Sequence, residues 1–152
     1  MMGITYADIE LTRAADLILV QEGYLSADQI RRVQVTALVD SGSSMLAIPR
    51  SLARLLDLRK RDEVQTELTN GDIRQAEVVG PIEVRFQNRR ATVDAVVIEA
   101  ETEVLLGAIP LQGMDVLIDP KRERLIVNPD SPDKARLLLK RASAGGLTLA
   151  EK

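Results

Sequence analysis

The sequence contains no cysteine and no histidine among its 152 residues. Without cysteine there is no disulfide, thiolate nucleophile or zinc–thiolate site, and without histidine there is no imidazole base or imidazole metal ligand. Mechanisms that pair serine or cysteine with histidine are therefore excluded within this chain. Proton transfer at an active site would have to use carboxylates, lysine, tyrosine or bound water, and carboxylates are the simplest candidates. We expect no metal and no cofactor.

A surplus of positive charge and a long apolar run are also missing. The 20 Lys and Arg residues are outnumbered by 23 Asp and Glu, for a formal net charge of -3, so the basic excess that nonspecific nucleic-acid binding requires is absent. No stretch approaches 18 continuous apolar residues, and the first residues lack the basic-then-apolar pattern of a secretory signal. We therefore expect a soluble cytoplasmic protein that binds neither nucleic acid nor membrane.

The chain has the length of one domain, and most of its segments have the pattern of short strands. A chain of 152 residues that is 45% hydrophobic can bury one core. Residues 14–23 read as a short helix or a covering strand, residues 50–58 as a short helix, and residues 133–142 as an amphipathic helix. The basic run at residues 59–61 reads as a solvated turn. Strands are expected at residues 4–11, 33–40, 44–49, 63–68, 73–79, 82–86, 91–100 and 124–129. Within residues 104–119, a short helix or turn after Gly107 is expected to lead into another strand.

Strands with turns every 8 to 12 residues predict a closed or partly closed β architecture with one or two short helices. Asn70-Gly71, followed by Asp72, separates two strand-like runs, and Asn-Gly is the strongest short-range hairpin signal. On its own, this dipeptide more commonly forms a plain surface hairpin. We predict a hairpin whose tip lies near residue 70.

The stretch ALVDSGSSMLAIP, residues 37–49, places an aspartate at the end of an apolar strand. Asp40, Ser41 and Gly42 would hold one carboxylate at a tight turn, because glycine lets the backbone come close and backbone N–H groups can reach the carboxylate oxygens. The alternative is an ordinary β-turn, since all three residue types are common in turns. Ser43 and Ser44 have no base to activate them as nucleophiles.

The same stretch, the Asn-Gly hairpin and the later Leu105-Leu106-Gly107 together resemble the retropepsin-like aspartic proteases. The resemblance covers about residues 33–128 and is closest to small single-domain bacterial members. The family pattern has two apolar residues, Asp-Thr/Ser-Gly, a small residue, apolar residues, a flap hairpin, and finally two aliphatic residues and a glycine. Ser41 stands where the retroviral branch usually has Thr, and Ser43 where Ala is usual.

The resemblance implies a mostly β, single-domain closed barrel and a role for each motif. Asp40 would be catalytic, Ser41 would brace it towards a partner subunit, and Gly42 would let the backbone approach. Leu106 and Gly107 would support the site from beneath, although Gly107 alone could be an ordinary strand bend. The implied substrate-binding residues of the flap and cleft are Ser43, Asn70, Gly71 and Asp72.

Peptide hydrolysis without a covalent intermediate needs two carboxylates that share one site with unequal protonation. The chain has one Asp-Ser-Gly, and Asp72, Asp94, Asp115 and Asp119 stand in different contexts. A twofold axis between two copies of Asp40 would supply the second carboxylate, so we expect a homodimeric aspartic endopeptidase acting on peptides or proteins. The alternative is a dimeric peptide-binding or assembly module with weak or lost catalysis, which the small number of aromatic residues favours.

The expected domain organisation has three parts. Residues 1–32 form an N-terminal extension, residues 33–130 the protease-like domain, and residues 131–152 a C-terminal helical tail that docks on its own domain or on the partner's.

Overall fold

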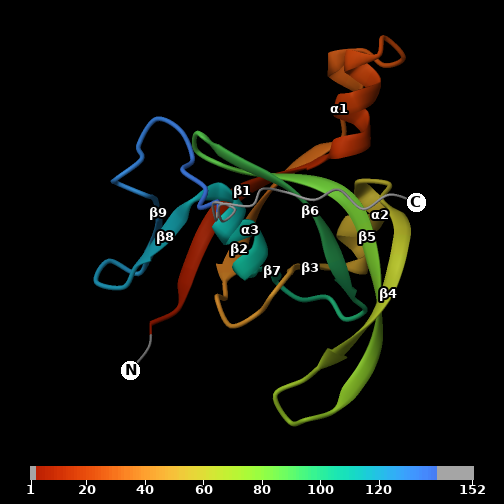
Figure 1. Ribbon diagram of the computed structural model, residues 1–152. Coiled ribbons are helices and arrows are strands. Elements are labelled where there is room, and N and C mark those ends of the chain that lie inside the picture. The colour runs from red at the N-terminus through yellow and green to blue at the C-terminus, as the bar shows by residue number, and fades with distance from the viewer. Residues whose placement is uncertain (1–2, 140–152) are drawn as a thin grey trace, which may run out of the picture.

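Six strands close into a barrel in the computed structural model, which describes residues 3–139 (Figure 1). The hydrogen-bonded order is β5-β6-β3-β7-β2-β1, and β1 returns to β5 to close the ring. Closure leaves none of these six strands as an unpaired edge within the ring. The strands are β1 (Thr5–Arg13), β2 (Arg32–Val39), β3 (Leu46–Pro49), β5 (Ile73–Phe86), β6 (Arg89–Ile98) and β7 (Val104–Leu106).

The barrel interior is filled by aliphatic side chains that alternate along the strands. In β1, Ala7, Ile9 and Leu11 are buried, while the alternating Tyr6 and Asp8 are exposed. This period of two is the pattern that a strand with one face on a core must have. The fully buried centre is made of Leu11, Ala37, Leu46, Ile48, Ile82, Val84, Ala95, Leu106 and Met114, all at 0% exposure.

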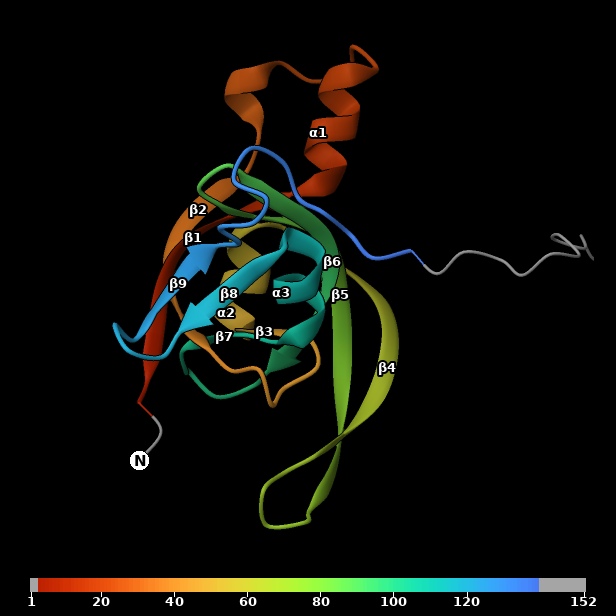
Figure 2. The ribbon, with the colours of Figure 1, turned by 60° about the vertical axis from the view of Figure 1, so that its left-hand side comes forward.

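Two features project from opposite ends of the barrel (Figures 1 and 2). At one end is α1 (Ala14–Gln21), followed by the short 3-10 helix η1 (Ala27–Gln29). At the other end β4 (Arg59–Glu67) pairs antiparallel with β5 and the two strands extend as a long hairpin. In both views the loop between β2 and β3 lies at the hairpin's end of the barrel.

The base of the helical projection is held by a buried carboxylate. Asp16 is 0% exposed and accepts hydrogen bonds from the guanidinium of Arg13 at 2.5 Å and from the backbone N–H of Arg31 at 2.8 Å. Burial by itself raises the pKa of Asp16, but the bonds from the Arg31 backbone and from Arg13, together with the charges of the two arginines, outweigh it, so the pKa is lowered overall. The projection is therefore attached to the barrel at both of its ends.

The remaining elements lie outside the ring of six strands. They are α2 (Arg50–Leu55), α3 (Ala108–Met114), β8 (Val116–Asp119) and β9 (Arg124–Val127). The last two form an antiparallel hairpin, and β9 joins the sheet through a parallel contact with β1, Tyr6 opposite Arg124. Among residues 3–139, no helix is long and apolar enough to cross a membrane.

The predicted mostly β closed barrel is confirmed, with differences in detail. Residues 3–139 contain three α-helices where one or two short helices were expected. The basic run Arg59–Arg61 belongs to β4 rather than to a solvated turn, because its backbone pairs with β5 while its side chains stay exposed. The two strands expected at residues 73–79 and 82–86 are one strand, β5, whose register shifts between Val79 and Ile82.

The segments outside the expected domain boundaries also have defined positions. Residues 5–13 form β1 and so belong to the barrel, although the sequence places them in an N-terminal extension. The helix predicted at residues 133–142 is absent from residues 133–139, and residues 140–142 lie outside the described residues. In place of helical hydrogen bonding, the backbone N–H of Arg136 donates to the carboxylate of Asp115 at 2.8 Å.

Candidate active site

Asp40 is positioned by the parallel pairing of β2 with β7. Val39 is opposite Leu106 in that ladder, and the backbone N–H of Asp40 donates to the carbonyl oxygen of Leu106 at 3.0 Å. The chain then leaves the sheet in a turn and re-enters it at Leu46, the start of β3. Leu46 and Leu106 are both 0% exposed, so the turn begins and ends on the core. The apolar residues on each side of Asp-Ser-Gly thus place the aspartate at the rim of the barrel.

Each carboxylate oxygen of Asp40 accepts one hydrogen bond from the turn. The backbone N–H of Gly42 donates to Oδ1 at 3.1 Å, and the hydroxyl of Ser43 donates to Oδ2 at 2.9 Å. The backbone N–H of Ser43 also donates to the carbonyl oxygen of Asp40 at 3.1 Å. The carboxylate is half-buried and Ser41 and Gly42 are exposed. The acid is therefore held in one orientation yet stays reachable from solvent.

Gly107 packs beneath this turn, as the resemblance implies. A Cβ at this position would lie 2.7 Å from the carbonyl oxygen of Ser43 and closer still to that of Met45. Both neighbours are backbone atoms, so there is no flexible side chain to move aside. The backbone N–H groups of Ala108 and Ile109 donate to the carbonyl oxygens of Ser43 at 2.7 Å and Ser44 at 2.8 Å. The start of α3 is thereby fastened to the turn.

The hairpin tip is closed by its own polar groups. Asn70 and Asp72 exchange two hydrogen bonds, from Asn70 Nδ2 to Asp72 Oδ2 at 3.1 Å and from the Asp72 backbone N–H to Asn70 Oδ1 at 3.0 Å. Between them Gly71 has a φ of 87°, in the left-handed region where glycine is favoured. These three residues therefore shape the tip, as the sequence predicts.

A cleft of about 840 Å³ separates the Asp40 turn from the β4–β5 hairpin. Gly42, Ser43 and Met45 form its wall on the side of the turn. Asn70, Gly71 and Asp72 are not among the residues that line it; residues further back along the hairpin are. The lining that sequence reasoning missed includes Met45, Val64, Thr66, Leu68, Arg74, Ala76, Ile98 and Leu105.

An ion-pair cluster lies beside one end of the cleft. The guanidinium of Arg50 donates to Glu99 at 2.6 Å and to Glu77 at 2.9 Å. These bonds, chiefly that to Glu99, raise the pKa of Arg50, and the bond from Arg50 lowers the pKa of Glu99. Glu99 also lines the cleft, so this end of the cleft carries an ionised acid at neutral pH. Within residues 3–139, no three His, Cys, Asp or Glu side chains come together as a metal site would require.

The comparison with protein families decides the assignment. The family model described as aspartyl protease matches residues 28–109, more than half of the chain. The chain belongs to the aspartyl protease family. The match contains the Asp40 turn, the hairpin and Gly107, so the predicted resemblance is confirmed. Family membership supports a hydrolase that acts on peptide bonds. A search of curated proteins gives no match.

Proposed function

We propose that the protein is a homodimeric aspartic endopeptidase with an active site shared between two copies of Asp40. The observation that carries the proposal is the Asp40 turn itself, where one reachable carboxylate is held through both oxygens at the edge of a cleft. One chain thereby supplies one of the two carboxylates that peptide hydrolysis without a covalent intermediate needs. Among the described residues, the other aspartates that sequence analysis considered have their own partners or lie elsewhere.

The surroundings of those aspartates support the shared site. Asp94 pairs with Arg61 at 3.0 Å, and Asp119 with Arg122 at 3.1 Å. Asp115 accepts hydrogen bonds from Asn128, Ser131 and the backbone of Arg136, and Asp72 lies at the hairpin tip. None of these four aspartates lines the cleft beside the Asp40 turn. The second carboxylate would therefore come from Asp40 of a second copy.

In this site one carboxylate would remove a proton from water while the other, protonated, donates to the carbonyl oxygen of the scissile peptide. Water adds to the carbonyl carbon, and the tetrahedral intermediate collapses when a proton passes to the departing nitrogen. The hydroxyl of Ser41 is exposed beside Asp40 and would brace the partner's turn. The Gly42 N–H would keep Oδ1 in position throughout.

The cleft between turn and hairpin suits an extended peptide. An extended substrate can add hydrogen bonds along the hairpin, and closure of the hairpin would exclude water. Val64, Leu68, Ala76 and Ile98 give the cleft small and medium aliphatic walls. The ionised Glu99 at one end would favour a basic side chain there.

The second candidate is a dimeric peptide-binding or assembly module with weak or lost catalysis. It is favoured by the small number of aromatic residues, two Tyr and one Phe, because peptide pockets often have aromatic walls. Peptide cleavage by the wild-type chain distinguishes the two candidates, because only the endopeptidase is expected to cleave peptides efficiently. The cytoplasmic location expected from the sequence stays a prediction.

The decisive test replaces Asp40 with Asn, which keeps the size and the acceptor oxygen but removes the acid. We expect cleavage of a peptide library to fall by about 10³-fold or more, while sedimentation still shows the dimer. The matched control is Asp28→Asn, an exposed aspartate in η1, which should cleave like the wild type. Full activity of the Asp40→Asn variant would exclude the proposed site, and an inactive wild type that binds peptides would favour the binding module.

A further inference from the structure

A groove of about 660 Å³ lies where the helical projection meets the outside of the barrel. α1 forms one wall, and residues of β1, β5 and β6 form the floor. The projection stands at the end of the barrel opposite the β4–β5 hairpin (Figures 1 and 2). Among residues 3–139, those that line this groove are different from those that line the cleft beside Asp40. We name it the α1 groove and define it by Leu17, Ile18, Val20, Arg32, Arg85 and Arg90.

The wall formed by α1 is apolar on every side. Residues 17–20 read Leu-Ile-Leu-Val, and four consecutive residues go round more than one full turn of a helix. A helix that is apolar all round is normally buried. In this chain Ile18 is 54% exposed and Leu19 is 37% exposed, while the one charged residue of the helix, Asp16, is buried. α1 therefore presents apolar surface of the kind that a soluble domain covers with a partner.

The floor of the groove presents positive charge to solvent. The side chains of Arg32, Arg85 and Arg90 are 47%, 44% and 69% exposed. The acids beside them lie deeper, since the side chain of Glu10 is 23% exposed and that of Glu83 is 9% exposed. The carboxylates are therefore covered, and the guanidinium groups form the surface that an incoming molecule meets.

These arginines keep donors available. Arg85 and Arg90 approach the two oxygens of Glu83 at 3.5 Å and 3.6 Å, and Arg32 is 3.7 Å from Glu10. Such separations exceed the length of an ordinary N–H···O hydrogen bond, about 3.2 Å at most. Each guanidinium carries five N–H donors, and a carboxylate can accept two of them at once. An acidic side chain entering the groove would therefore find charged donors that the two glutamates do not saturate.

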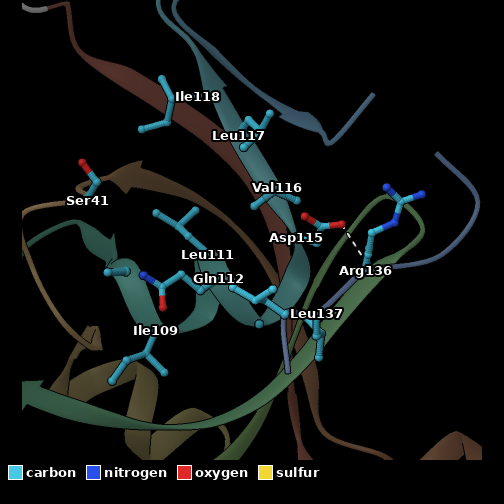
Figure 3. A pocket seen from close by; sticks show the side chains of 13 residues that line it. Ser41, Ile109, Leu111, Gln112, Asp115, Val116, Leu117, Ile118, Arg136 and Leu137 are labelled. Carbon is cyan, nitrogen blue, oxygen red and sulfur yellow. Dashed lines mark hydrogen bonds between the residues drawn. The ribbon is translucent and has the colours of Figure 1, made fainter. Parts of the chain in front are cut away.

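Charge distinguishes the α1 groove from two other hollows of the surface. The cleft beside Asp40 is lined by two acids, Glu67 and Glu99, and by one arginine, Arg74. The groove between α3 and β8 is lined by one acid and one base, Asp115 and Arg136, joined by a hydrogen bond from the Arg136 backbone (Figure 3). The α1 groove has three arginines and two acids in a chain whose formal net charge is -3. An acidic ligand is thus better matched to the α1 groove than to the cleft.

We propose that the α1 groove binds a segment of a different protein in which acidic and aliphatic side chains occur together. The aliphatic side chains pack against Leu17, Ile18 and Val20, and the carboxylates bind the exposed guanidinium groups. Arginine and apolar side chains are the groups that protein interfaces favour. A concave groove between a helix and a sheet fits a polypeptide segment better than it fits a flat lipid surface. The proposal does not depend on the shared Asp40 site.

A library of random peptides displayed on phage tests the proposal. The library is selected on the Asp40→Asn chain, which excludes cleavage, and then depleted of peptides that also bind the Asp40→Asn chain carrying Arg90→Gln and Ile18→Ser. We expect the remaining peptides to be enriched in Asp and Glu together with Leu, Ile and Val. Their binding should weaken as salt is added, because exposed charges are screened.

Single variants then locate the binding site of a selected peptide labelled with a fluorophore. We expect Arg32→Gln and Arg90→Gln each to raise its dissociation constant about tenfold, the effect of losing one charged hydrogen bond. Ile18→Ser should do the same through lost apolar burial. Because all three side chains are substantially exposed, their replacement leaves the fold of the chain intact.

The matched controls lie outside the groove. Arg124→Gln removes an exposed arginine of β9, and Leu55→Ser removes an exposed aliphatic side chain of α2. Neither should change the dissociation constant of the selected peptide. A circular dichroism melt of each variant confirms that it is folded.

Three results would overturn the proposal. The first is that depletion leaves no binders, or leaves binders rich in Lys and Arg. The second is that Arg90→Gln and Ile18→Ser change self-association in sedimentation, which would make a second copy the occupant. The third is that the chain binds phosphatidylserine vesicles and that the same two variants abolish this binding, which would assign the α1 groove to a membrane surface.

Discussion

Gly107 lies directly against the backbone of Met45, at a separation that leaves no room for a Cβ. Two further hydrogen bonds, from Ala108 to Ser43 and from Ile109 to Ser44, tie the same two segments together. The turn that presents Asp40 and the junction between β7 and α3 are therefore one rigid unit. The orientation of the carboxylate depends on a glycine 67 positions later in the sequence.

Replacement of Gly107 by Ala should displace the Asp40 turn. Backbone atoms would be forced apart, so we expect a loss of about 1–3 kcal/mol in the free energy of unfolding and a fall in cleavage of more than about tenfold. The control is Gly113→Ala, where the new Cβ would be 3.1 Å from a single methyl group, that of Ala91. Urea unfolding and peptide cleavage measure both effects, and equal results for the two variants would mean that Gly107 does not support the site.

Leu68 should contact substrate, because it lines the cleft beside the hairpin tip. We expect Leu68→Asp to lower kcat/KM about tenfold through lost apolar contact, with little effect on stability since the side chain is already exposed. Ile73, across the hairpin and 64% exposed, does not line the cleft. If Ile73→Asp lowered kcat/KM as much, the hairpin would not close on the substrate in the proposed way.

Dilution should reduce specific activity if two copies share the site. Below the dissociation constant, the cleavage rate should rise with the square of protein concentration, because the dimer is the active species. At concentrations well above the dissociation constant, addition of an equal amount of the Asp40→Asn variant should lower wild-type activity to about half, since half of the wild-type chains then belong to mixed dimers that contain one acid. Activity that is strictly proportional to concentration and unaffected by the variant would indicate a site within one chain.

Asp115 should contribute to stability at neutral pH but not in strong acid. Hydrogen bonds from Asn128, Ser131 and the Arg136 backbone lower the pKa of Asp115 to about 2. A carboxyl group whose pKa is lowered on folding stabilises the protein above its ordinary pKa, near 3.8, and this contribution is lost as the pH falls towards 2. The stability difference between wild type and Asp115→Asn should therefore be largest above about pH 5 and shrink below pH 4.

Urea midpoints measured from pH 2 to pH 7 would show this trend. The exposed Asp130→Asn serves as control and should differ little from wild type at any pH. A difference for Asp115→Asn that stayed constant over the whole range would contradict the assigned hydrogen bonds.

Local signals in the sequence predicted the geometry of the Asp40 turn and of the hairpin. Asp40, Gly42 and the hairpin at Gly71 were found because turns leave a signature in adjacent residues, and the turn and hairpin geometries match. The steric role of Gly107 followed from the family resemblance, and its packing against the turn is present. The roles of these residues in catalysis stay predictions.

Features that depend on distant pairing were not predicted from the sequence. β1 closes the barrel by pairing with β5, with Leu11 opposite Val84. The residues around position 11 carry no local pattern that predicts this pairing. The residues that line the cleft were not predicted for the same reason, because Val64 and Ile98 are far apart in the sequence and come to line one cleft only in the folded chain. The leucine run at residues 137–139 has a helix-like pattern, but residues 133–139 form no helix and a hydrogen bond from Arg136 to Asp115 ties the segment to the barrel.

The position of β1 also bears on how the molecule is assembled during synthesis. This strand precedes its partners in the chain, since it pairs with β5 and, at Tyr6, with Arg124 of β9. Contacts so far apart in sequence slow folding, because a long loop must close before they form. The barrel therefore cannot close at β1 before β5 has been synthesised, and the contact of β1 with β9 forms later still.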